Sequence, residues 1–212
     1  MNISAINGSP KTKKNASGSI IRQMEKLLGV NVETHHAAQL VSGETPGETI
    51  INILSSDALL IAFPLYVDSL PAPLIELLSR LENAVRGGAA KPRIYAIVNN
   101  GFFEASQNTL ALEMIEHFAR RTGMPWGYGI AIGGGGMLVG LGEDWSKGPS
   151  SGIYRAMREM AGAIREKRSG PNVFVTPKMP RFIYRIAGDL GMRRFAKKKG
   201  VFNLRDKPYT ES

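Results

Sequence analysis

Short apolar segments alternate along this chain with segments of helical periodicity, and this alternation restricts the fold more than any other feature. The expected strands are residues 2–6, 30–34, 58–63, 93–98 and 128–132. The expected helices are residues 20–28, 48–55, 73–86, 107–121 and 150–168, and in the fourth of these Leu110, Met114 and Phe118 repeat at a spacing of four. Such alternation predicts a parallel sheet covered by helices on both faces. Residues 58–63 are apolar without interruption, as is typical of a central strand in such a sheet.

A polar loop connects the first expected strand to the first expected helix. It begins with Asn7-Gly8-Ser9-Pro10-Lys11, continues to Ser19, and contains three lysines. A helix N-terminus presents unpaired backbone N–H groups and the positive end of the peptide dipole, so it attracts anions. We therefore expect a phosphate seat here, with hydrogen-bond donors from Ser9, Asn15, Ser17 and Ser19 and positive charge from Lys11, Lys13 and Lys14. The alternative is an ordinary connection capped by Ser17 or Ser19, because neither G-x-G-x-x-G nor G-K-[ST] is present.

Two further loops follow expected strands. Pro64-Leu65-Tyr66-Val67 comes directly after residues 58–63, and Asn99-Asn100-Gly101-Phe102 comes directly after residues 93–98. In an open parallel sheet, ligands bind outside the carboxyl ends of the strands where the strand order reverses. For the order 2-1-3-4-5 this point lies between strands one and three. The three loops are therefore expected to meet around one ligand, and a flat, polar-edged ring with a phosphate tail suits their chemistry.

In this order, the three loops resemble those of the NAD(P)H-dependent FMN reductase-like family of flavoproteins. The resemblance covers residues 1–168. It implies a flavodoxin-like α/β fold, which is a three-layer sandwich with a five-stranded parallel sheet in the order 2-1-3-4-5. It assigns the FMN phosphate to Ser9, Lys11, Asn15, Ser17 and Ser19. It assigns the flavin ring to Pro64, Leu65, Tyr66 and Val67, and the pyrimidine side or far edge of the ring to Asn99, Asn100, Gly101 and Phe102.

The resemblance implies an FMN-dependent oxidoreductase that transfers hydride from NADH or NADPH through the flavin to a small acceptor, such as a quinone, a nitroaromatic compound or a free flavin. No catalytic side chain is expected, because the flavin carries the chemistry. The resemblance also implies a homodimer. The alternative is a flavodoxin-type electron carrier that does not oxidise NAD(P)H. Such carriers are typically strongly acidic, whereas residues 1–168 contain 17 Lys and Arg against 15 Asp and Glu.

Several classes of protein are disfavoured by composition. Cysteine is absent, which excludes disulfides, thiolate metal sites and cysteine-ligated iron–sulfur clusters. No metal site is expected at His35 and His36, because adjacent residues at a strand end point to opposite faces. The chain has neither a signal-peptide pattern at its start nor an apolar run of about 18 residues, so a cytoplasmic location is expected.

Positive charge is concentrated in the last part of the chain. Residues 169–212 contain 10 Lys and Arg against 3 Asp and Glu. We expect them to form a basic C-terminal extension that packs on or near the domain of residues 1–168 through an apolar stripe of Phe182, Ile183, Ile186 and Leu190. The alternative is a weak contact with an anionic surface, and no nucleic-acid partner is expected. A module driven by this tail alone would leave the three loops unexplained.

Four consecutive glycines at 133–136 follow the last expected strand. Glycine runs are common in mobile loops, and mobility is the prediction for this run. The alternative is a close approach of the backbone to another molecule, which only a residue without a side chain permits.

Overall fold

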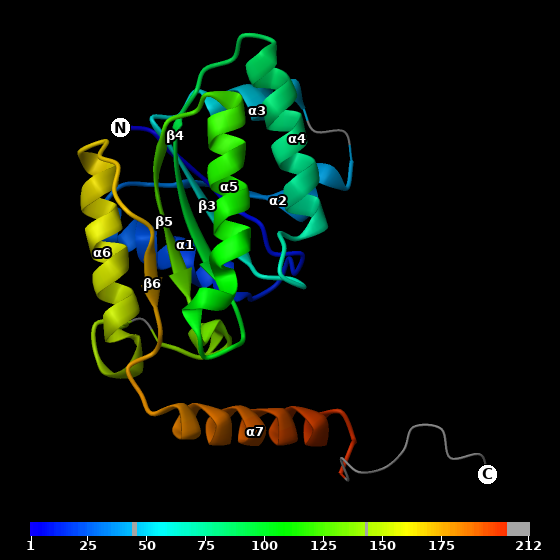
Figure 1. Cartoon of the computed structure of the whole chain (residues 1–212). Helices are drawn as coiled ribbons and strands as arrows, with labels where there is room; N and C mark the ends of the chain where they lie inside the picture. The colour runs from blue at the N-terminus through cyan, green and yellow to red at the C-terminus, as the bar shows by residue number, and fades with distance from the viewer. Residues whose placement is uncertain (44–45, 143, 203–212) are drawn as a thin grey trace, which may run out of the picture. The chain divides into compact units, whose positions relative to one another are not determined.

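The computed structural model of the chain describes residues 1–43, 46–142 and 144–202 (Figure 1). The chain divides into two compact units, Met1–Lys178 and Met179–Ser212, and each is described by itself. The first unit extends beyond residue 168, where the domain was expected to end, because residues 173–175 belong to its sheet.

The first unit contains one sheet in which neighbouring strands are parallel, in the order β2-β1-β3-β4-β5-β6. The strands are β1 (Ile3–Asn7), β2 (Glu33–His36), β3 (Ala58–Pro64), β4 (Arg93–Asn99), β5 (Trp126–Ile132) and β6 (Val173–Val175). The expected order of the first five strands is confirmed, but the expectation of only five strands is wrong. β6 has three residues, and so short a run is recognisable only by its pairing with Ile130–Ile132 of β5.

The arrangement of β1, β3 and β4 brings three loops to the same end of the sheet. β3 lies between β1 and β4, and all its residues except Pro64 are buried, as its apolar sequence predicts. Asn7 is in register with Ala62, and Pro64 with Asn99. The strand order reverses between β1 and β3, because β2 lies on one side of β1 and all later strands lie on the other. A ligand site is therefore expected outside these carboxyl ends.

Helices cover both faces of the sheet, so the first unit has the three layers that the sequence predicts (Figure 1). α1 (Ala16–Leu28) and α6 (Ser151–Arg165) share a cluster of buried side chains with one face. α3 (Gly47–Leu54), α4 (Ala72–Arg86) and α5 (Thr109–Thr122) share a second cluster with the other face. The short elements are α2 (Ala37–Val41), η1 (Ala105–Asn108), η2 (Gly135–Val139) and η3 (Gly148–Ser150).

The buried face of α5 is not the one marked by its repeat of large apolar residues. Leu110 and Met114 are exposed, whereas Ala111, Leu112 and Ile115 are buried. The physical reason is close packing on β5, where a Cβ at Gly129 would lie 2.2 Å from Leu112 Cδ1. Glycine on the strand lets Leu112 of the helix approach closely, so Leu110 and Met114 face outward, whereas Phe118 is partly buried against the second cluster.

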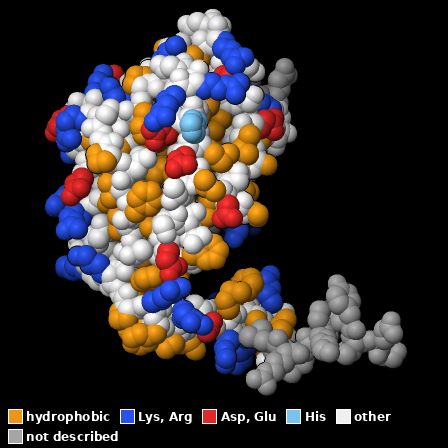
Figure 2. Space-filling view, in the orientation of Figure 1, with side chains coloured by type: hydrophobic (Ala, Val, Ile, Leu, Met, Phe, Trp, Pro, Cys, Tyr) orange, Lys and Arg blue, Asp and Glu red, His pale blue; other side chains and the backbone are white. Residues whose placement is uncertain are grey.

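The surfaces of the two units differ in charge. The face of the first unit in Figure 2 carries Lys and Arg side chains interspersed with Asp and Glu.

The described helix of the second unit is α7 (Arg181–Lys198), in which no side chain is buried. Its apolar stripe ends at Leu190, because Arg193 and Lys197 continue the same helical spacing. Packing of this stripe on the first unit stays a prediction. None of the described helices has both the length and the hydropathy of a membrane span.

Candidate functional site

The loop between β1 and α1 is shaped by hydrogen bonds within itself. The backbone N–H of Ser9 donates to Asn7 Oδ1 (3.1 Å), and the N–H of Lys11 donates to Ser9 Oγ (3.2 Å). Gly8 is needed for packing on the scaffold, because a Cβ there would lie 2.8 Å from Phe63 Cβ in β3. The loop is thus held against the end of β3 before any ligand is considered.

Asn15 is the N-cap of α1 and makes four hydrogen bonds, to the loop and to the elements on either side of it. Its Oδ1 accepts from the N–H of Gly18 (2.8 Å) and from Asn7 Nδ2 (3.3 Å). Its Nδ2 donates to the carbonyl oxygens of Lys11 (2.7 Å) and Lys13 (2.8 Å). Both amide hydrogens are therefore used within the loop, so Asn15 fixes the shape of the seat. The hypothesis of a serine cap is wrong, because Asn15 takes that position.

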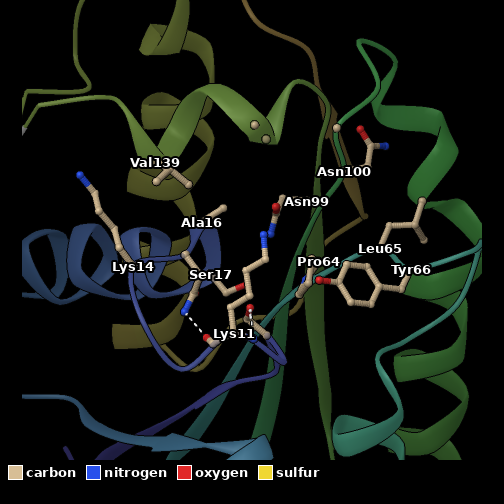
Figure 3. A pocket seen from close by; sticks show the side chains of 15 residues that line it. Lys11, Lys14, Ala16, Ser17, Pro64, Leu65, Tyr66, Asn99, Asn100 and Val139 are labelled. Atoms are coloured by element: carbon tan, nitrogen blue, oxygen red, sulfur yellow. Dashed lines mark hydrogen bonds between the residues drawn. The ribbon is translucent and has the colours of Figure 1, made fainter. Parts of the chain in front are cut away.

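The groups left for an anion lie at the first turn of α1 (Figure 3). The N–H groups of Ala16 and Ser17 precede the capped N–H of Gly18 and have no carbonyl of the helix to donate to. Ser17 is 1% exposed, and its Oγ has no hydrogen-bond partner among the described residues. Ser9 Oγ accepts from the N–H of Lys11 and keeps its own hydrogen for donation.

The histidine pair at the end of β2 does not converge on one ligand. His36 Nε2 lies 3.1 Å from the carbonyl oxygen of Lys11, so the imidazole N–H donates to the first loop. His35 Nε2 lies 3.4 Å from a carboxylate oxygen of Glu33. Burial lowers the pKa of His35 and outweighs the raising effect of Glu33, so this ring is neutral at pH 7.

Hydrogen bonds join the ends of β3 and β4 on the opposite side of the site. The N–H of Leu65 donates to the carbonyl oxygen of Asn99 (2.8 Å), and Asn99 Nδ2 donates to that of Phe63 (3.0 Å). Asn100 Nδ2 donates to the carbonyl oxygen of Glu104 (3.1 Å). Asn100 Oδ1 is buried and has no partner in the described part of the chain. It is the second buried polar atom at this site that a ligand could satisfy.

A two-residue turn follows Leu65. Tyr66 and Ser69 exchange two backbone hydrogen bonds of 3.0 Å around it. Its central residues, Val67 and Asp68, have left-handed φ angles of 49° and 56°, as in a type I′ turn. Val67 is 98% exposed. The turn holds Tyr66 beside the site, whereas the Val67 side chain extends into solvent.

Three residues of the glycine run at 133–136 are hydrogen-bonded to other segments of the chain, and mobility of the run stays a prediction. The N–H groups of Gly133, Gly134 and Gly135 donate to the carbonyl oxygens of Val175 (2.9 Å), Phe102 (2.5 Å) and Asn100 (2.6 Å). A Cβ at Gly133 would lie 2.1 Å from the carbonyl oxygen of Phe103, and one at Gly135 would lie 2.8 Å from that of Asn100. The close approach that glycine permits is to this chain's own loop after β4.

These segments enclose a pocket of about 300 Å³ at the carboxyl end of the sheet (Figure 3). In Figure 3, Lys11 and Ser17 lie on one side of it, and Pro64, Leu65 and Tyr66 lie on the other. The structure brings most of the expected site residues together here: Ser9, Lys11, Asn15, Ser17, Pro64, Leu65, Tyr66, Asn99, Asn100 and Gly101. The expected residues that do not line the pocket are Ser19, Val67 and Phe102.

Lys14, which was expected to add positive charge to the loop, also lines the pocket, and sequence reasoning missed Ala16, Gly135, Gly136 and Val139. A signal was available for the glycines, because a glycine run directly after a strand suits close backbone approach. Lys14 and Ala16 lie in the expected loop, but only the structure shows which of its side chains face inward. Ser19 faces away, and its Oγ donates to the carbonyl oxygen of Asn15 (3.3 Å).

The lining can bind a phosphorylated ring compound but offers few groups for proton transfer. Its titratable side chains are Lys11, Lys14 and Tyr66. Throughout the described ranges, no three His, Cys, Asp or Glu side chains gather into a set that could hold a metal ion. The site therefore combines a helix N-terminus and lysines for an anion with a slot between residues 64–66 and 99–101.

Comparison with known protein families gives no match. Comparison with curated protein sequences gives none either. Among solved structures, the chain is similar to an NADH:FMN oxidoreductase in its apo form, with a TM-score of 0.58 and 16% identity over 80% of this chain and 90% of that one. It is similar to an NADPH-quinone reductase from P. pentosaceus, with a TM-score of 0.55 and 19% identity over 76% of this chain and 98% of that one. It is also similar to an archaeal flavodoxin, with a TM-score of 0.50 and 12% identity over 78% of this chain and 98% of that one. These likenesses show a flavodoxin-like fold and agree with the resemblance that the loops predicted.

Proposed function

We propose that this chain is an FMN-dependent oxidoreductase that takes hydride from NADH or NADPH and reduces a small acceptor such as a quinone. The fold is that of flavin oxidoreductases and flavodoxins. The similarity to an NADH:FMN oxidoreductase and an NADPH-quinone reductase supports the proposed donor and acceptor classes. The family resemblance further supports action as a homodimer.

The observation that carries the proposal is the unpartnered hydroxyl of Ser17. A buried polar group without a hydrogen bond costs about 1–3 kcal/mol. Ser17 Oγ is in this condition at the first turn of α1, in a pocket that also contains Lys11 and Lys14. A phosphate there would accept from the hydroxyl and from the backbone N–H groups of the turn, which removes the cost.

The other half of the pocket fits a flat ring. Pro64, Leu65 and Tyr66 form one side, and Asn99, Asn100 and Gly101 come from the neighbouring loop. Asn100 Oδ1 is a buried acceptor that a ring N–H could satisfy. Gly135 leaves space beside it, because a Cβ there would lie 2.8 Å from both Asn99 Oδ1 and the Asn100 carbonyl oxygen.

When bound, FMN would supply the electron-transfer chemistry. The residues of this chain bind and orient it: Ser9, Lys11 and Ser17 hold the phosphate, while residues 64–66 and 99–101 hold the ring. Asn15 keeps the first loop in shape through its four hydrogen bonds. No side chain is required as an acid or base, which is consistent with a lining whose titratable groups are two lysines and a tyrosine.

The proposal is tested by reconstituting the purified protein with FMN, desalting it and recording its visible absorbance. We expect stoichiometric flavin, and oxidation of NADH or NADPH when a benzoquinone is added. Bound FMN without NAD(P)H oxidation would favour the flavodoxin-type carrier instead. A protein that takes up no flavin under these conditions would contradict both functions.

A further inference from the structure

A second pocket borders the proposed phosphate seat. It has a volume of about 290 Å³ and shares Lys14 and Val139 with the first pocket. None of the ring-side residues 64–66 and 99–101 lines it. The second pocket therefore continues from the phosphate end of the first pocket, on the side away from the ring slot.

One wall of this second pocket is a polar and cationic face of α1. It is lined by Ser19, Arg22, Gln23 and Lys26. Each of these residues is three or four positions from two of the others, so they share one side of the helix. Arg22 uses one N–H to donate to Ser19 Oγ (3.0 Å), and a guanidinium has five such donors. With Lys14, the described lining holds three cationic side chains.

The rest of the lining is largely apolar and comes from the last residue of η2 and the segment after it. It consists of Val139, Leu141, Gly142 and Trp145. Trp145 is buried, and its indole N–H donates to the carbonyl oxygen of Gly142 (3.1 Å), which fixes the ring in place. The pocket thus places positive charge beside an apolar surface, which is the pairing that a phosphate attached to an aromatic base requires.

We propose that this second pocket binds an anionic extension of the flavin phosphate, namely the second phosphate and the nucleoside of FAD. The inference rests on the proposed flavin site and extends its cofactor class from FMN to the dinucleotide. Lys14 would lie between the two phosphates, because it lines both pockets. Arg22 and Lys26 would bind the added phosphate, and the apolar wall would pack against the base.

The test compares the equilibrium dissociation constants of FMN and FAD, followed by flavin fluorescence. The full chain is compared with its Arg22→Ala/Lys26→Ala variant. Both residues are exposed on α1, and alanine preserves helix propensity, so circular dichroism should show an unchanged fold. We expect the parent to bind FAD at least as tightly as FMN. In the variant, FAD should bind about tenfold or more weakly, with FMN changed less than about threefold.

A matched control removes two exposed positive charges elsewhere. Lys91→Ala/Arg158→Ala changes the net charge by the same amount outside both pockets, so it should leave both affinities unchanged. An equal loss of FAD affinity in the control would overturn the inference, because the loss would then follow from the net charge of the protein and not from the second pocket. Full FAD affinity in Arg22→Ala/Lys26→Ala would overturn it as well.

Two further outcomes separate this inference from the proposed function. If the parent binds FMN but binds FAD much more weakly, the second pocket does not take the dinucleotide, and the FMN site stands. If neither flavin binds, the proposed function itself fails. NADPH also carries a phosphate that the second pocket could bind in place of the second phosphate of FAD. A raised KM for NADPH relative to NADH in the FMN-loaded variant, with FAD binding intact, would assign the pocket to the electron donor and overturn the inference.

Discussion

At the scale of single residues, two neighbouring polar side chains of the first loop have different roles because of their partners. Every polar hydrogen of the Asn15 amide is used by a carbonyl oxygen of the loop. The Ser17 hydroxyl, two residues later, is buried without a partner in the described structure. An asparagine whose bonds are complete supports the loop, whereas a serine whose bonds are incomplete is available to a ligand.

Replacing Ser17 with alanine should weaken FMN binding without weakening the fold. A charge-assisted hydrogen bond to phosphate contributes about 1.5–3 kcal/mol, so the dissociation constant for FMN should rise about tenfold or more. Riboflavin, which lacks the phosphate, should bind equally well to parent and variant. The melting temperature of the protein without flavin should not fall, because the removed hydroxyl has no partner to lose. Flavin titrations and thermal melts measure these effects.

Ser19→Ala is the matched control for this experiment. Ser19 lies on the same helical turn but does not line the first pocket. Its replacement should leave the ratio of FMN to riboflavin affinity unchanged. Equal affinity of the parent protein for FMN and riboflavin would show that the loop is not a phosphate seat.

At the scale of elements, the turn at Val67 and Asp68 is built from residues that do not favour its conformation. Both have left-handed φ angles, and a β-branched residue adopts such angles at a cost. Since Val67 is almost fully exposed, burial within this chain does not offset that cost. The turn nevertheless forms, because Tyr66 and Ser69 pair on either side of it.

Val67→Asn should therefore stabilise the protein. Asparagine tolerates the left-handed region and is favoured in type I′ turns, so we expect a gain of about 1 kcal/mol and a melting temperature higher by about 2–4 °C. Flavin affinity should not change, because Val67 does not line the pocket. Val30→Asn serves as a control for replacing an exposed valine whose φ is not left-handed. A lower melting temperature for Val67→Asn would contradict the strain argument.

The glycine run gives a second test at this scale, because two of its members differ in their surroundings. A Cβ at Gly135 would lie 2.8 Å from two oxygen atoms of the loop after β4, whereas a Cβ at Gly136 would have nothing within 4 Å. Neither residue has a left-handed φ. Both line the first pocket, so their positions relative to the ligand are comparable.

Gly135→Ala should lower both stability and flavin affinity, because the added methyl group forces the two loops apart. The cost of such overpacking is about 1–3 kcal/mol. Gly136→Ala should be neutral, or stabilising by about 0.4–1 kcal/mol through reduced entropy of the unfolded chain. Denaturant unfolding of the two variants measures the difference. Equal stability would mean that the run is free to move, as the sequence first suggested.

At the scale of the whole molecule, the folded core and the excess positive charge belong to different parts of the chain. The buried members of both clusters lie between Ile3 and Ile164. Residues 169–212 instead contain 10 Lys and Arg against 3 Asp and Glu. The unit Met1–Lys178 contains all the residues that line the candidate pocket.

A chain truncated after Lys178 should fold cooperatively and bind FMN as tightly as the full chain does. Gel filtration, thermal melting and flavin titration measure this. The same variant tests the prediction that the stripe of α7 packs on the first unit. If it packs, truncation lowers the melting temperature, whereas changing Lys197, Lys198 and Lys199 together to serine does not. An unfolded truncation product would contradict the division of the chain at Lys178.

The order of the first five strands came from the family resemblance of the three loops. The sequence by itself determined the layers of the first unit and the position of these three loops at the carboxyl ends of strands. These features follow from local patterns, because periodicity is set by neighbouring residues and the carboxyl ends of parallel strands lie together. Only the tertiary structure decided which loop residues face inward, with Ser17 in the pocket and Ser19 outside it. It also decided the role of Gly133 to Gly135, the buried face of α5 and the presence of β6. Each of these depends on contacts between segments far apart in the chain, such as Gly135 with Asn100 and Val173 with Ile130, and no local pattern records such contacts.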